Sequence, residues 1–169
     1  MYQALEILTV LLVAISMAMA LAHALELPGK RRLPKETYAA VQPIYYPGFT
    51  IGGGVGEFGG MVATLVLLVV TPAGTRGFWL ILAAFIALLA MHAAYWVLTH
   101  PVSNFWLREV QPGGAGGRFF AFDPLKRNVG SAPPDWTELR DRWENSHLIR
   151  AVLGFTGFAL LVIALALRP

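Results

Sequence analysis

Two ionisable side chains lie well inside apolar segments of this chain, where they could transfer protons or bind a ligand. Glu57 is about two helical turns inside one apolar run, and His92 is at a similar depth in the next run. A charged group in hydrocarbon is costly, so such a residue has to be paired, hydrated or neutral. Glu57 and His92 are therefore predicted catalytic residues.

Two histidine–carboxylate pairs have a spacing that metal-binding helical bundles use. The pairs are His23-Ala-Leu-Glu26 and Glu144-Asn-Ser-His147, and a separation of three residues places both side chains on one helix face. Bundles that bind two metal ions combine Glu-x-x-His pairs with carboxylates from other helices, and a mixed nitrogen and oxygen set suits iron, manganese, zinc or copper. A bound metal or haem, acid–base chemistry without a metal, and interfacial residues that only bond neighbouring helices all remain open. The candidate metal ligands are His23, Glu26, Glu57, His92, Glu144 and His147.

Four apolar segments must position these residues. At about 1.5 Å per residue, each is long enough to cross a hydrocarbon layer of about 30 Å. The composition, 56% hydrophobic and 14% charged, is typical of an integral membrane protein. We therefore predict an all-α, up-down-up-down four-helix bundle in which residues 1–169 form one domain. The predicted spans are 4–26, 49–71, 78–99 and 148–167, the last preceded by a helical entry from 135.

Antiparallel threading of these spans brings one end of each toward the same side of the bundle. His23, Glu57, His92 and His147 come from four different spans, and each lies toward that side. We expect at least two of the histidines to approach Glu57, or one another, closely enough for a hydrogen bond or a shared ligand.

Proline and glycine mark the predicted ends of the helices. Pro28 and the glycine after it predict the end of the first span, and His100-Pro101 predicts a break after the third. A long connection rich in glycine and proline, residues 111–134, then leads to Asp135, a predicted helix N-cap. No proline or glycine interrupts 135–153, so the last helix is expected to continue into the membrane.

Glycines recur every four residues at the start of the second span. Gly52, Gly56 and Gly60 form a smooth stripe that lets another helix backbone approach closely. The same run lacks the Lys-Ser/Thr ending of a phosphate-binding loop, so helix packing is the favoured interpretation.

Basic residues are distributed unevenly between the two sides. Of thirteen Lys and Arg residues, eleven lie in 27–48 and 100–150, and only Arg76 and Arg168 lie on the other side. This bias predicts cytoplasmic long loops and external termini, in a bacterial inner membrane. It indicates orientation and lipid contact, and no motif points to nucleic acid. With no cysteine in the chain, disulfides, thiolate catalysis and cysteine-based metal sites are excluded.

A motif near the third and fourth spans resembles a known family. The sequence contains Pro101-Val-Ser-Asn104, followed by Trp136-Thr-Glu-Leu-Arg140-Asp-Arg-Trp143-Glu-Asn-Ser-His147-Leu-Ile-Arg150. Together with His23-Ala-Leu-Glu26-Leu-Pro-Gly-Lys30 and Gln42-Pro-Ile-Tyr45-Tyr46, this pattern resembles the bacterial branch of the anthrone-oxygenase-like integral membrane family, over nearly the whole chain.

The resemblance implies a four-helix membrane protein with Asn104, Trp143, His147 and Arg150 in one site. For the fungal branch it implies oxidation of anthrones to anthraquinones by molecular oxygen, with no established cofactor. We therefore expect a membrane oxidoreductase that acts on a hydrophobic aromatic or quinone-like molecule, with His147 as base and Arg150 and Asn104 stabilising the anion. One alternative is a non-catalytic accessory subunit of a larger membrane complex, bound to another membrane protein or to further copies of this chain. The other alternative is a membrane protein that binds a small molecule, haem or metal.

Overall fold

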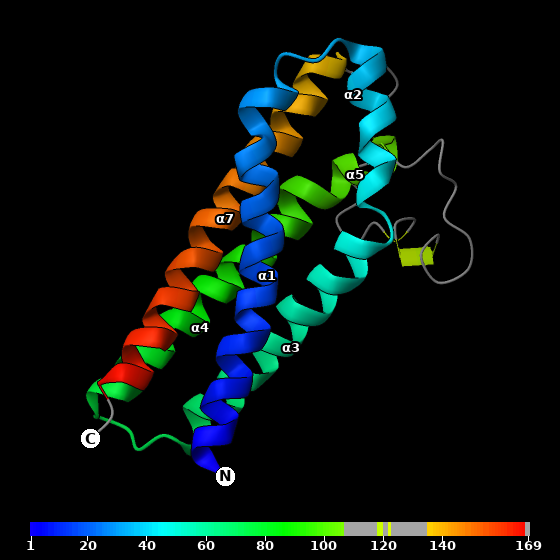
Figure 1. The fold of residues 1–169 in the computed structure, drawn as a ribbon. Coiled ribbons are helices and arrows are strands. Elements are labelled where there is room, and N and C mark those ends of the chain that lie inside the picture. Colours follow the sequence, from blue (N-terminus) through cyan, green and yellow to red (C-terminus); the bar gives the residue numbers. More distant parts are fainter. Residues whose placement is uncertain (107–117, 120–121, 123–134, 168–169) are drawn as a thin grey trace.

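Four long antiparallel helices make up most of this protein. The computed structural model describes residues 1–106, 118–119, 122 and 135–167. The main helices are α1 (Tyr2–Lys30), α3 (Gly48–Val70), α4 (Arg76–Ala94) and α7 (Trp136–Ala166). They run alternately up and down, so both chain ends lie at the same end of the bundle (Figure 1). Four helices among the described residues are long and apolar enough to cross a membrane, which confirms the predicted all-α membrane bundle.

The glycine stripe of α3 is the place where α1 packs most closely. A Cβ atom added at Gly56 would lie 2.8 Å from the backbone nitrogen of Ser16, and one at Gly60 would lie 3.0 Å from Val13 Cγ2. Only glycine permits such an approach, so the packing role predicted for the stripe is confirmed. Since α1 already fills it, the stripe is not available to a partner protein.

The third span does not break at His100-Pro101, as the sequence had suggested. After α4 the helix widens into one π-helical turn, Tyr95–Thr99, and continues as α5, His100–Trp106. Pro101 has no N–H and so donates no hydrogen bond within the helix. Arg142 of α7 donates from Nη2 to the carbonyl oxygen of Val97, four residues before the proline, at 2.9 Å. The wider turn and this outside donor allow the helix to pass the proline.

The first span also extends beyond its predicted end. α1 continues through Pro28 and the following glycine and ends at Lys30. A short helix, α2 (Lys35–Val41), and a 3-10 turn (Gln42–Tyr45) then lead back to α3. α2 lies beside the start of α7 at the far end of the bundle from both termini (Figure 1).

α2 is anchored by one fully buried tyrosine. Tyr38 packs in a cluster with Val102, Trp106 and Leu139, which joins α2 to α5 and α7. α7 is continuous as predicted, and Asp135 is its N-cap, accepting from the Thr137 amide at 3.2 Å. Most of the predicted connection 111–134 lies outside the described residues.

Candidate functional site

Glu57 is the centre of a polar cluster that joins three helices. Its side chain, on α3, is buried, and one oxygen accepts from Arg150 Nη2 of α7 at 2.7 Å. The other oxygen lies 2.7 Å from His92 Nδ1 of α4. Glu57 was predicted to need a partner, and it has two: the Arg150 guanidinium and the His92 imidazole. Arg150 also lies over the Tyr95 ring, 5.1 Å from its centroid, a cation–π distance.

Trp96 fixes the proton position on His92. The indole N–H of Trp96 points to His92 Nε2 at 2.9 Å, and an indole nitrogen can only donate. His92 Nε2 is therefore the acceptor, so Nδ1 carries the proton and donates to Glu57. Both Glu57 oxygens accept, which matches an ionised carboxylate paired with Arg150.

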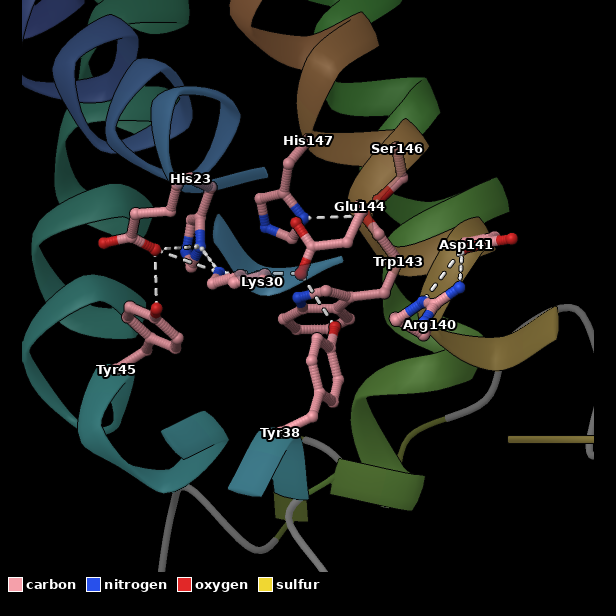
Figure 2. A network of polar contacts seen from close by, with 11 residues as sticks. His23, Lys30, Tyr38, Tyr45, Arg140, Asp141, Trp143, Glu144, Ser146 and His147 are labelled. Carbon is pink, nitrogen blue, oxygen red and sulfur yellow. Dashed lines mark hydrogen bonds and ion pairs between the residues drawn. The ribbon is translucent and has the colours of Figure 1, made fainter. Parts of the chain in front are cut away.

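Lys30 organises a second cluster, nearer the end of the bundle that α2 covers (Figure 2). Its side chain is buried, and Nζ lies 3.0 Å from Glu26 and 3.6 Å from Glu144. Nζ also lies 3.3 Å from His23 Nδ1, which must be the acceptor because an ammonium only donates. A buried lysine between two carboxylates binds α1 to α7 at this end.

Two tyrosines complete the second cluster. Tyr38 donates its phenolic proton to Glu144 at 2.7 Å, and Tyr45 donates to Glu26 at 2.5 Å. Burial raises the pKa of Tyr38 far above its usual value, and the neighbouring Glu144 raises it further. The Tyr38 phenol therefore stays protonated and remains a donor.

His147 and His23 lie ring to ring between the two clusters, with centroids 4.1 Å apart. His147 Nδ1 is 2.9 Å from the backbone oxygen of Trp143, to which it can only donate. In neutral His147 the lone pair is therefore on Nε2. Such a fixed tautomer is what a general base requires.

A cavity of about 440 Å³ connects these groups. Aromatic rings form much of its wall, and Glu57, His92, His147 and Arg150 supply polar groups. The wall on the α3 side includes Gly53 and the glycine after it, where an added Cβ would meet nothing within 4 Å. The main aromatic lining residues are Tyr45, Phe49, Phe58, Tyr95, Trp96, Trp106 and Trp143.

Some buried polar atoms around the cavity have no partner. They are both amide atoms of Gln42, Nε1 of Trp143 and Nε of Arg150. Unpaired buried donors and acceptors destabilise a protein, so their gathering at one cavity indicates a polar ligand.

The six predicted metal ligands divide between the two clusters. Glu57 and His92 lie in the first, Glu26 and Glu144 lie at Lys30, and His23 and His147 form the histidine pair. Among the described residues, no three His, Asp or Glu side chains are placed to hold one metal ion. The physical reason is that cations already occupy the carboxylates: Arg150 binds Glu57, and Lys30 lies between Glu26 and Glu144.

The predicted catalytic residues are brought together in part. Glu57, His92, His147 and Arg150 all line the cavity. Asn104 belongs to α5, but its side chain lies outside the described part of the structure.

Several residues of the site were missed from the sequence, namely Lys30, Tyr38, Gln42 and Trp96. Trp96 follows His92 by four residues, and Lys30 follows Glu26 by four, so helical spacing could have identified both. Gln42 belongs to the motif that carries the family resemblance, but nothing in the local sequence predicts that its side chain lines a cavity.

Comparisons of the chain with protein-family models, with curated proteins and with solved structures find no match.

Proposed function

We propose that this protein is a membrane oxidoreductase of the anthrone-oxygenase type. Its substrate is a hydrophobic aromatic or quinone-like molecule with an acidic C–H or phenol. Such a molecule reaches the cavity from the lipid, since Phe58 of the cavity wall is also largely exposed on the bundle. A cavity of about 440 Å³ is within the usual size range for a small-molecule site.

The observation that carries the proposal is the placement of His147 and Arg150. Both lie on α7, one turn apart, and both line the cavity. His147 presents a lone pair on Nε2, while Arg150 keeps an unpaired N–H at Nε beside its ion pair with Glu57. A base and a fixed cationic donor are the two groups that formation of a carbanion or phenolate needs.

The reaction follows from these two groups and molecular oxygen. His147 Nε2 takes a proton from the ring methylene, and Arg150 stabilises the negative charge on the conjugated carbonyl oxygen. The carbanion reduces O₂ and bonds to it, and the proton held by His147 completes a hydroperoxide. Loss of water, with the second methylene hydrogen, leaves a new carbonyl. In sum, one CH₂ and one O₂ give one C=O and one H₂O.

The surrounding residues act as positioning groups. Glu57 orients the Arg150 guanidinium, and His92 and Trp96 orient Glu57 through a chain of hydrogen bonds. Asn104 is proposed as a further donor to the anion, by the resemblance described above.

We further propose a bacterial inner membrane location, with external termini and cytoplasmic long loops. The support is the uneven distribution of Lys and Arg along the chain. The cavity would then lie nearer the cytoplasmic side, because its α7 residues are close to the start of that helix.

A turnover assay tests the proposed function. Purified protein in mild detergent is mixed with anthrone in air, and anthraquinone formation and oxygen uptake are followed together. The expected result is protein-dependent formation of anthraquinone with one O₂ consumed per product. His147→Gln should lower the rate about 100-fold or more, the usual contribution of a general base.

Asn145→Ala provides a matched control, since Asn145 is an exposed neighbour of His147 on α7. It should keep the parent rate. Equal rates for His147→Gln and the parent, or no oxidation above the protein-free rate, would reject the proposal.

A further inference from the structure

Gln42 is a buried amide whose side chain has no protein partner. It is 3% exposed, and neither Nε2 nor Oε1 has a hydrogen-bond partner. It lies in the turn after α2, four residues beyond the buried Tyr38, and it lines the cavity. Leaving such an amide unpaired costs stability, so its position at a cavity wall points to a ligand that pairs with it.

Trp143 of α7 supplies a second unpaired donor at the cavity wall. Its Nε1 is buried without a partner, and its ring lies against His147, with centroids 4.7 Å apart. Figure 2 shows the Trp143 ring between His147 and Tyr38, at the end of the bundle that α2 covers. An indole N–H can only donate, so the ligand atom it meets must be an acceptor.

The polar groups of α7 form a line along the cavity. Trp143, His147 and Arg150 follow one another at helical spacing on one face, and they cover about 10 Å at ~1.5 Å per residue. A donor thus lies at each end of the line, and the proposed base lies between them. This order matches a flat molecule with oxygens on opposite sides of its central ring, one toward each donor.

We propose that Gln42 and Trp143 form a second oxygen-binding subsite, which holds the carbonyl of the quinone product opposite the one bound by Arg150. This inference rests on the proposed function, because the second oxygen is the atom that the reaction installs. Before oxygen is added, the methylene carbon faces this subsite without a hydrogen-bond acceptor. After oxidation, the new carbonyl oxygen accepts from Trp143 Nε1 and from the Gln42 amide.

Binding of anthrone and anthraquinone tests the subsite, because the two molecules differ only at this position. Affinities are measured by equilibrium dialysis in detergent micelles under nitrogen, so that no oxidation occurs. The parent should bind anthraquinone more tightly than anthrone. Gln42→Leu and Trp143→Phe should each reduce that preference by about five- to tenfold, the effect of one buried hydrogen bond. The ratio of the two affinities is compared between parent and variant, so that the micelle partition of each ligand, which is the same in both samples, cancels.

Thermal stability of the empty protein gives an independent readout. Gln42→Leu removes an unsatisfied buried amide, so the empty protein should melt roughly 2 °C or more above the parent. A merely structural Gln42 would instead make the variant less stable. Gln3→Leu and Trp136→Phe, at residues outside the cavity lining, serve as controls and should leave the ligand preference unchanged.

The results separate this subsite from the proposed reaction. An unchanged anthraquinone preference in both Gln42→Leu and Trp143→Phe would overturn the subsite, even if the parent oxidises anthrone. If the two variants lose the anthraquinone preference but the parent does not oxidise anthrone, the subsite is supported and the reaction is rejected. If the parent binds neither molecule, both proposals fail.

Discussion

The ion pair between Glu57 and Arg150 gives the sharpest prediction on stability. Both side chains are largely buried, at 8% and 12% exposure, and their charged atoms are 2.7 Å apart. Glu57→Gln keeps the size of the side chain but removes its charge. Arg150 is then left as a buried cation without a counter-charge, and the new amide has to face the Nδ1–H of His92.

The expected magnitude follows from the distance and the burial. At an effective dielectric constant of about 20, unit charges 2.7 Å apart attract each other by about 6 kcal/mol. Desolvation of both groups offsets part of this, and removal of one member of a buried pair costs about 3–5 kcal/mol. Arg150→Met should cost a similar amount, since it strands the carboxylate. The double variant should be destabilised by less than the sum of the two single variants, by about 2 kcal/mol or more.

The stabilities of the parent, the two single variants and the double variant are measured by unfolding in mixed micelles with sodium dodecyl sulfate. Circular dichroism follows the loss of helix. Glu36→Gln, at an exposed glutamate of α2, is the matched control and should unfold like the parent. The reasoning is refuted if Glu57→Gln unfolds at the parent's detergent fraction, or if the single-variant losses simply add.

Three further predictions concern packing, the π-helical turn and orientation. Gly56→Leu should lose about 1–3 kcal/mol by forcing α1 away, whereas Gly54→Leu, where a Cβ meets nothing, should unfold like the parent; equal stability of the two would show that the stripe is not packed. Arg142→Met should cost about 1 kcal/mol in the same unfolding assay by removing the hydrogen bond from Arg142 to the Val97 carbonyl, and no loss would contradict that role. Introduced cysteines at exposed Thr37 and Ala73 should be labelled from the cytoplasm and from outside, respectively, and the reverse pattern would invert the proposed topology.

The fold was largely predictable from the sequence because each span is a long apolar run. Hydrophobicity and length determine whether a helix crosses a membrane, and alternate threading then fixes the order of the helices. The glycine stripe was predictable for a similar reason, since small residues at a spacing of four have one main use in membrane helices. The predicted break at Pro101 was wrong because the donor that rescues the helix, Arg142, comes from a different helix 41 residues along.

The site was predictable only where chemistry and helical position agree. Glu57 had to have a partner because of its depth, and the structure supplies both His92 and Arg150. Lys30 belongs to the motif that carries the family resemblance, but its buried position was not predicted, because Pro28 indicated that the first helix ends before it. Gln42 belongs to the same motif, but its place in the cavity wall could not be predicted, because that depends on burial against distant helices, which no local pattern encodes.

The source of the oxygen in the product tests the central claim most directly. Anthrone is incubated with the purified protein under heavy-isotope oxygen gas, and the anthraquinone formed is analysed by mass spectrometry. If a base and an anion-stabilising arginine act with O₂, the anthraquinone formed should carry one labelled oxygen atom. His147→Gln should form this labelled product about 100-fold more slowly than the parent. Unlabelled anthraquinone, or labelled product formed at the same rate without His147, would contradict the account.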